Sequence, residues 1–233
     1  DQRAQLDLVQ AMNQNYLKRA QVDPDVEGLI ETYELAFRMQ SAVPDVLTLK
    51  GESEATRKAY GLDDPATRDF GTQCLMARRL AEKGVRFIEL SKGNWDQHSN
   101  LKAQLTQNCR AIDKPIAALM NDLKSRGMFE DTLIFWGGEF GRTPNGQGND
   151  GRNHNARGYT VWLAGGGVKG GQRIGVCDPL TGAAVDGKIH LHDLHATMLH
   201  LLGLDHEKLT YRYNGRDFRL TDVEGRVVKE ILA

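Results

Sequence analysis

The sequence of 233 residues has no long apolar run and almost no net charge. No stretch approaches the roughly 20 consecutive apolar residues that cross a bilayer, and the first residues contain no signal-like apolar segment. Its 31 acidic and 30 basic side chains leave a net charge of -1. This balance gives no indication of nucleic acid or an anionic membrane as a partner. The length suits one domain or slightly more, with enough surface to bury a core.

Cysteine is also scarce, whereas glycine is abundant in one part of the chain. Cys74, Cys109 and Cys177 are widely spaced and odd in number, so they form neither a CxxC metal pattern nor a disulfide framework. We interpret them as ordinary thiols. The 25 glycines concentrate after position 137. This shift in composition separates a helical first part from a second part of strands and loops.

Hydrophobic periodicity predicts helices alternating with short strands. Apolar residues at a spacing of three to four predict helices over residues 1 to about 40, 52–60, 64–84, 99–127 and 193–202. Runs of β-formers predict strands at 85–90, 132–136 and 159–164. Asn214-Gly215 predicts the tip of a hairpin. This alternation is typical of an α/β layered fold.

The strand predicted at 132–136 has polar residues directly after it. Its apolar residues suit a strand buried on both faces of a parallel sheet, and ligands bind beyond the carboxyl ends of such strands. Glu139 and Arg142 follow, separated by glycines that allow close backbone approach. The alternative is a glycine-rich turn in which Glu139 and Arg142 form a surface ion pair.

Three loop segments next to predicted strands carry metal-type ligands. Asp96 and His98 follow the strand at 85–90, Glu139 follows the strand at 132–136, and His154 precedes the strand at 159–164. A mixed set of oxygen and nitrogen ligands suits zinc, manganese or similar ions. A segment of this kind by itself is more often a solvated turn than a metal site, so the prediction rests on the coincidence of all three at one sheet edge.

A fourth cluster consists of His190, His192 and His195. On a strand, His190 and His192 would point to the same side and could chelate a metal ion. A hydrolase built on this cluster is therefore an alternative to one built on the loop residues. The alternative, which we favour, is structural. In that case Asp193 caps the following helix and the histidines pack near its start.

Several motifs together resemble one known family. They are Asn94–His98 (NWDQH), Gly138–Pro144 (GEFGRTP) and the tail from Tyr211 to Asp222. These resemble the DUF1501 family, a sulfatase-like group of the alkaline phosphatase superfamily, and the resemblance extends over nearly the whole chain. It implies an α/β fold of alkaline-phosphatase-like type, with a mostly parallel sheet flanked by helices and incomplete on its N-terminal side. Residues 1–82 would then be a helical segment packing on the sheet, and residues 83–233 the C-terminal part of the α/β domain.

The resemblance also implies a function. It would be a metal-dependent hydrolase of phosphate or sulfate esters, acting on a small anionic ester with one or two divalent ions, which would be zinc, manganese or calcium. The implied metal ligands are Asp96, His98, Glu139 and His154. Arg142 or Arg152 would hold the anionic oxygens of the substrate, because a guanidinium group matches their geometry. Relatives usually carry export signals, which implies an extracytoplasmic location.

Two departures from the superfamily pattern favour an alternative. Phe140 stands where the superfamily has a metal-binding histidine, and a phenyl ring cannot bind a metal. Nothing before residue 85 resembles the region that carries the superfamily's nucleophile, so this chain resembles the C-terminal portion of a longer protein. The alternative function is therefore a non-catalytic interaction domain that retains the hydrolase scaffold.

Overall fold

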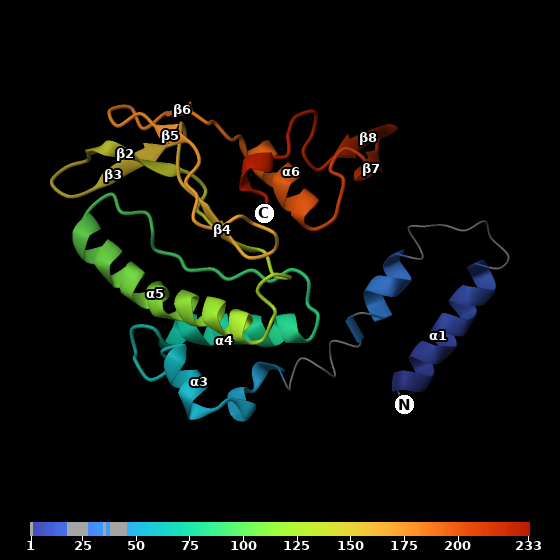
Figure 1. Cartoon of the computed structure of the whole chain (residues 1–233). Helices are drawn as coiled ribbons and strands as arrows, with labels where there is room; N and C mark the ends of the chain where they lie inside the picture. The colour runs from blue at the N-terminus through green and yellow to red at the C-terminus, as the bar shows by residue number, and fades with distance from the viewer. Residues whose placement is uncertain (1, 18–27, 35, 38–45) are drawn as a thin grey trace. The chain divides into compact units, whose positions relative to one another are not determined.

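The computed structural model describes residues 2–17, 28–34, 36–37 and 46–233 (Figure 1). The chain divides into two compact units, residues 1–53 and 54–233. The first unit contains helix α1 (Gln2–Leu17), helical residues at 28–34 and 36–37, and the short 3-10 helix η1 (Leu49–Gly51). The predicted helical character is confirmed for these residues, while the remainder of that prediction, at 1, 18–27, 35 and 38–40, lies outside the described residues.

The second unit begins with the helices α3 (Glu54–Ala59), α4 (Arg68–Glu82) and α5 (Leu101–Ser125). Helices α4 and α5 pack side by side (Figure 1). Each presents one apolar stripe to the other, as the spacing of their apolar residues predicts. The side chains buried in this part of the molecule include Phe70, Cys74, Leu75, Ile112 and Leu123.

Charged groups are enclosed within this helical layer. The Arg78 side chain is only 3% exposed, and its Nε lies 3.1 Å from Oδ2 of Asp122 on the facing helix. Its Nη1 lies 2.7 Å from Glu82. Arg126 contacts both carboxylates, at 2.7 Å from Asp122 and 2.6 Å from Glu82. The buried hydroxyl of Tyr60 donates to Asp122 at 2.9 Å. The two helices are therefore joined by a network of paired charges as well as by apolar contact.

The strands of the described residues pair two by two and antiparallel. The pairs are β1 (Ile134–Trp136) with β4 (Trp162–Ala164), β2 (Gly141–Gly146) with β3 (Arg152–Asn155), β5 (Val176–Cys177) with β6 (Ala184–Asp186), and β7 (Thr210–Tyr213) with β8 (Arg216–Arg219). The predicted alkaline-phosphatase-like architecture, a mostly parallel sheet flanked by helices, is therefore wrong.

The connection between β1 and β4 accounts for this difference. Parallel neighbours require a crossover of a dozen or more residues, usually a helix on the face of the sheet. The chain between β1 and β4 instead forms the β2–β3 hairpin, so it reverses direction and returns antiparallel, with Trp136 opposite Trp162. The predicted strand at 85–90 does not form in the described part of the chain, and Phe87 there is 80% exposed.

The C-terminal part is organised around α6 (Leu191–Leu201) and ends in the 3-10 helix η2 (Lys229–Ile231). Helix α6 begins two residues earlier than predicted, because His190 is its N-cap and Asp193 occupies the third helical position of a capping box. Thr197 of α6 is fully buried, and its Oγ1 accepts a hydrogen bond of 2.9 Å from the backbone of Val228. The β7–β8 hairpin turns at Asn214-Gly215 as predicted, with both residues at positive φ.

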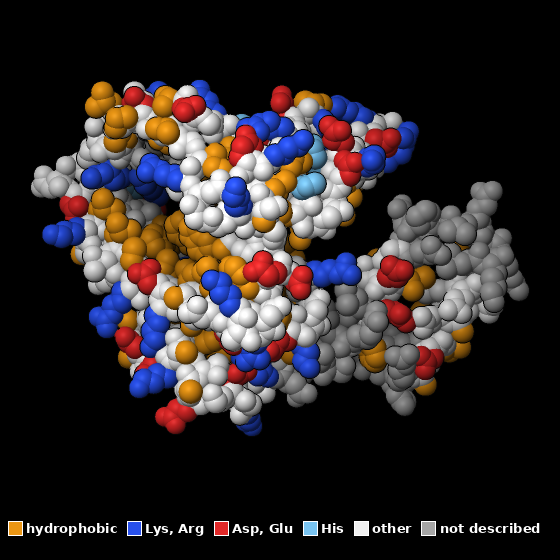
Figure 2. Space-filling model, viewed as in Figure 1, with side chains coloured by type: hydrophobic (Ala, Val, Ile, Leu, Met, Phe, Trp, Pro, Cys, Tyr) orange, Lys and Arg blue, Asp and Glu red, His pale blue; other side chains and the backbone are white. Residues whose placement is uncertain are grey.

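The surface of this unit combines dispersed charge with a local apolar region. Figure 2 shows hydrophobic side chains gathered in a hollow between the helices and the strand pairs, with basic and acidic side chains interspersed over the rest of this face. Such interspersion agrees with the near-zero net charge of the sequence. Among the described residues, none of the helices has the length and apolar character required to cross a bilayer.

Candidate metal centre

The loop that carries Asp96 and His98 is held by a row of tryptophan side chains. The indole Nε1 of Trp95 donates to the carbonyl of Lys92 at 2.7 Å. The Trp95 ring meets Trp136 of β1 edge to face, at 6.4 Å between centroids, and Trp136 stacks on Trp162 of β4 at 6.3 Å. The β1–β4 pair therefore fixes the position of Trp95, and Asp96 follows it directly.

Buried amide side chains hold the same loop from two other directions. Gln97 is 4% exposed, and its side chain donates to the carbonyl of Asn94. Asn108 of α5 donates to that same carbonyl. The backbone carbonyl of Gln97 in turn accepts from the backbone N–H of Arg152, at 3.1 Å, at the start of β3. With Gln97 directed inward, its neighbours Asp96 and His98 are both exposed.

The β2–β3 hairpin supplies the other half of the cluster. Arg142 of β2 pairs directly with His154 of β3. The next residue, Asn155, is 6% exposed, and its side-chain amide donates to the carbonyls of Gly158 and Gly182 at 3.2 Å and 2.8 Å. Because Asn155 is anchored inward, the preceding His154 lies on the opposite, exposed side of the strand.

Asp96, His98 and His154 form the candidate metal centre. Among the described residues, these three are the only group of histidine, cysteine and acidic side chains whose ligand atoms all lie within 4.8 Å of one another. Nε2 of His154 lies 2.9 Å from Oδ1 of Asp96, and Nε2 of His98 lies 3.1 Å from the same oxygen. The two Nε2 atoms are 3.2 Å apart. The three ligand atoms thus form a nearly equilateral triangle.

Arg142 completes the electrostatic environment of this triangle. Its Nη1 donates to Oδ1 of Asp96 at 2.7 Å, and its side chain is 24% exposed. Hydrogen bonds from His154 and Arg142, together with the positive charge of Arg142, lower the pKa of the Asp96 carboxyl to about 2. Asp96 therefore remains a carboxylate, the form that binds a metal ion, at any physiological pH.

Two further side chains contact the histidine rings of the cluster. Phe140 lies against His154, with 4.2 Å between ring centroids. The guanidinium carbon of Arg142 lies 5.5 Å from the centre of the Phe140 ring. Oε1 of Gln147 lies 2.7 Å from Nδ1 of His98. No motif in the sequence marked Gln147, because a glutamine within a glycine-rich turn carries no signal of its own.

The structure thus brings together three of the four predicted metal ligands. Glu139 is exposed and does not belong to the group of Asp96, His98 and His154, whose ligand atoms lie within 4.8 Å of one another. Its role as a ligand therefore stays a prediction. Arg142 lies beside the cluster and pairs with Asp96, whereas the ion-pair alternative had paired it with Glu139. Nη1 of Arg152 donates to the carbonyl of Gly151 at 2.8 Å, and its predicted contact with substrate also stays a prediction.

The histidine cluster at the start of α6 has a structural arrangement. Nδ1 of His190 accepts from the backbone N–H of His192 at 3.2 Å, and the backbone N–H of His190 donates to Asp193 at 3.0 Å. The rings of His190 and His192 meet edge to face at 4.8 Å. These contacts satisfy the N-terminus of the helix, which favours the structural alternative for this cluster.

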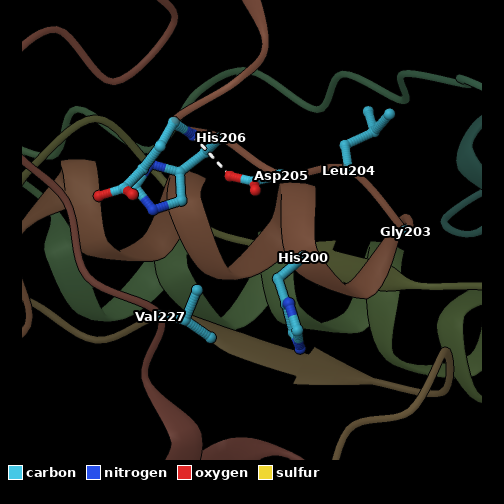
Figure 3. A pocket seen from close by; sticks show the side chains of 7 residues that line it. His200, Gly203, Leu204, Asp205, His206 and Val227 are labelled. Carbon is cyan, nitrogen blue, oxygen red and sulfur yellow. Dashed lines mark hydrogen bonds between the residues drawn. The ribbon is translucent and has the colours of Figure 1, made fainter.

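A separate open cavity of about 360 Å³ lies at the other end of α6 (Figure 3). It is lined by His200, Gly203, Leu204, Asp205, His206, Glu207 and Val227. His206 is 7% exposed, and its Nδ1 lies 3.0 Å from Oγ1 of the fully buried Thr221. This hydrogen bond indicates a structural role for His206. The described residues that line the cavity do not form a ligand cluster like that of Asp96.

Gly151 allows the two halves of the candidate metal centre to approach each other. A Cβ atom at this position would lie 2.0 Å from the backbone oxygen of His98. Gly151→Ala is therefore expected to force the loop and the hairpin apart and to lower the midpoint of urea unfolding. We expect a loss of about 1–3 kcal/mol, as for other overpacked sites.

Gly146→Ala is the matched control for this substitution. Gly146 lies in the same hairpin, and the nearest atom to its Cβ position is the end of the Arg152 side chain at 3.8 Å. We expect Gly146→Ala to change the unfolding midpoint little. Equal losses in the two variants would contradict the close approach of Gly151 to His98.

The comparisons with known proteins match the chain to a family. A family model described as "Protein of unknown function (DUF1501)" matches residues 1–232. No curated protein and no solved structure matches the chain.

Proposed function

The chain belongs to the DUF1501 family, and we propose that it is a metal-dependent hydrolase of phosphate or sulfate esters, with Asp96, His98 and His154 as the metal ligands. The family description assigns no function, so the proposal rests on the geometry of the cluster and on the chemistry of its residues. We also propose that the protein is sulfatase-like, as the resemblance of its motifs implies.

The triangle of ligand atoms is the observation that carries the proposal. Zinc binds imidazole nitrogen and carboxylate oxygen at about 2.0–2.1 Å, so the edge of a zinc tetrahedron is about 3.3 Å. The edges between Asp96, His98 and His154 are 2.9, 3.1 and 3.2 Å. Three protein ligands leave the fourth position open, which is the pattern of catalytic rather than structural zinc sites.

The donor set also bears on the identity of the metal. Calcium takes oxygen ligands almost exclusively, whereas imidazole suits zinc and other transition metals. Two of the three donors here are imidazole nitrogens, which favours zinc or manganese over calcium. Three ligands hold one ion, and Phe140 cannot contribute a further donor for a second. We therefore propose a single ion.

Arg142 supports an anionic substrate. Its guanidinium lies beside the cluster, where a phosphate or sulfate bound to the ion would be within its reach. All three proposed ligands are exposed, so a small ester has access to the open position. When bound, the ion would supply Lewis acidity to a phosphoryl or sulfuryl oxygen. Arg142 would orient that group and balance its negative charge.

Metal binding tests this proposal. We expect the purified protein to bind about one zinc ion in isothermal titration calorimetry and to gain thermal stability with zinc, because a ligand of the native state stabilises it. The double variant His98→Ala with His154→Ala is expected to lose at least about 100-fold in zinc affinity, which exceeds the loss typical of an outer-shell substitution. Turnover of p-nitrophenyl phosphate or sulfate by the zinc-loaded protein then tests the hydrolase activity.

His195→Ala is the matched control. His195 is an exposed histidine on α6, and its removal is expected to leave zinc affinity unchanged. Loss of zinc in this variant would instead assign the metal to the His190–His195 cluster. A wild-type protein that binds neither zinc nor manganese, with unchanged stability in chelator, would contradict the proposal. It would favour the interaction-domain alternative.

A further inference from the structure

One ring nitrogen of His98 faces the candidate metal centre, and the other faces away from it. Nε2 is one corner of the triangle, 3.1 Å from Oδ1 of Asp96 and 3.2 Å from Nε2 of His154. Nδ1 points to the turn between β2 and β3, where Oε1 of Gln147 lies at 2.7 Å. The amide oxygen is an acceptor, so the ring must donate from Nδ1. A neutral imidazole that carries its proton on Nδ1 has a free lone pair on Nε2, the atom that would bind the metal.

Gln147 is itself held in place by its backbone. Its N–H donates to the carbonyl of Gly151 at 2.8 Å, which closes the turn from 147 to 151. The same turn touches the backbone of His98, because the Cβ position of Gly151 lies 2.0 Å from the His98 oxygen and 3.1 Å from the Gln147 oxygen. The backbone contact and the side-chain hydrogen bond therefore join the same two segments. This double connection fixes the distance between Gln147 and His98.

We propose that Gln147 is a positioning residue that fixes the tautomer and the ring orientation of His98. Metal-binding histidines in proteins usually donate their second N–H to a carboxylate or a carbonyl, which directs the other nitrogen to the ion. The side-chain carbonyl of Gln147 accepts the second N–H of His98 in the same way. The consequence for metal affinity rests on the proposed function, whereas the consequence for the tautomer does not.

The test uses the whole protein and three variants. Gln147→Leu removes the acceptor at similar size, Gln147→Glu retains an acceptor oxygen, and Asn145→Leu changes an exposed position of the same hairpin. The first readout is the tautomer of His98 in the metal-free protein, from the 15N chemical shifts of its ring. The second readout is zinc affinity by calorimetry.

We expect the Nδ1–H tautomer in the wild-type protein, in Gln147→Glu and in Asn145→Leu. In Gln147→Leu we expect a shift towards the Nε2–H form. Zinc affinity is expected to fall about 10–100-fold in Gln147→Leu and to be restored in Gln147→Glu. A purely structural role for Gln147 would not alter the tautomer and would not be rescued by glutamate.

The two readouts separate this inference from the proposed function. If the wild-type ring carries its proton on Nε2, or if Gln147→Leu leaves the tautomer unchanged, the positioning role is overturned. If the tautomer responds as expected but the wild-type protein binds no metal ion, the positioning role stands and the proposed function fails.

Discussion

Replacing Asp122 with alanine is expected to lower the free energy of unfolding by about 3–5 kcal/mol, because it removes one of the two carboxylates that pair with the buried guanidinium of Arg78. The Arg78 side chain is 3% exposed and lies 3.1 Å from Asp122. Asp122 also accepts hydrogen bonds from Tyr60, at 2.9 Å, and from Arg126, at 2.7 Å. Alanine has the highest helix propensity, so the expected loss cannot come from the helix itself. Urea unfolding followed by far-UV circular dichroism measures the change.

Two further variants show whether the network is the cause. Asp113→Ala removes an exposed carboxylate from the same helix, and we expect a change within about 0.5 kcal/mol. Tyr60→Phe removes only the hydroxyl, whose pKa is raised by burial and by the neighbouring Asp122. Its loss should be about 1.5–3 kcal/mol, the range for a hydrogen bond to a charged group. If Asp122→Ala is no more destabilising than Asp113→Ala, Arg78 does not depend on Asp122 for its burial.

The helices could be predicted from the sequence because the patterns that indicate them are local. The apolar stripes of α4 and α5 and the positive-φ Asn214-Gly215 turn are properties of a few consecutive residues. The Arg78–Asp122 network carries no such signal. Arg78 and Asp122 are 44 positions apart in the sequence. Nothing in the residues around Arg78 indicates that Asp122 will lie against it. Long-range pairs of this kind become visible only once the helices are placed.

The sheet was predicted wrongly for a related reason. The runs at 132–136 and 159–164 do contain strands, β1 and β4. Their apolar character indicates burial but does not specify a partner or a direction. Direction was decided by the segment between them, which folds into the β2–β3 hairpin instead of a crossover helix. At 85–90 the alternating pattern was present, but pairing also requires a partner strand alongside.

The candidate metal centre was predicted in part. Asp96, His98 and His154 were identified by residue type and by family motifs, and the structure brings them within a few ångströms. The geometry shows in addition that Arg142 contacts Asp96 and that Gln147 contacts His98. Both contacts connect β2 or its turn to the loop before α5. The sequence does not encode that juxtaposition locally, so it could not have indicated these two roles.

Asp96→Asn is expected to have the largest effect on metal binding, because Oδ1 of Asp96 is the atom on which the cluster converges. Nε2 of His154 and of His98 and Nη1 of Arg142 lie 2.9, 3.1 and 2.7 Å from it. Asparagine keeps the shape of the side chain but presents a neutral amide in place of a carboxylate. We expect zinc affinity to fall more than about 100-fold, beyond the range for outer-shell partners. Asp113→Asn, which neutralises an exposed carboxylate on α5, should leave zinc affinity unchanged.

The same substitution has a second, metal-independent consequence. Hydrogen bonds from His154 and Arg142 lower the pKa of Asp96 to about 2 in the folded protein, against about 3.9 for an unperturbed aspartate. A carboxyl whose pKa is lowered by folding adds stability above the unfolded pKa and loses it as the pH falls through the folded pKa. In the absence of metal, the wild-type protein should therefore be more stable than Asp96→Asn at neutral pH. The two stabilities should converge as the pH falls from about 4 to about 2.

The two measurements on Asp96→Asn report on different properties of the site. Convergence at low pH depends only on the contacts of the carboxylate with His154 and Arg142 in the metal-free protein. Loss of zinc depends on the carboxylate acting as a ligand. A stability difference that persists unchanged down to pH 2 would contradict the arrangement around Oδ1. Unaltered zinc affinity together with convergence would show that the triangle forms but binds no metal ion. Asp96 would then hold the loop to the hairpin through Arg142, as a structural ion pair.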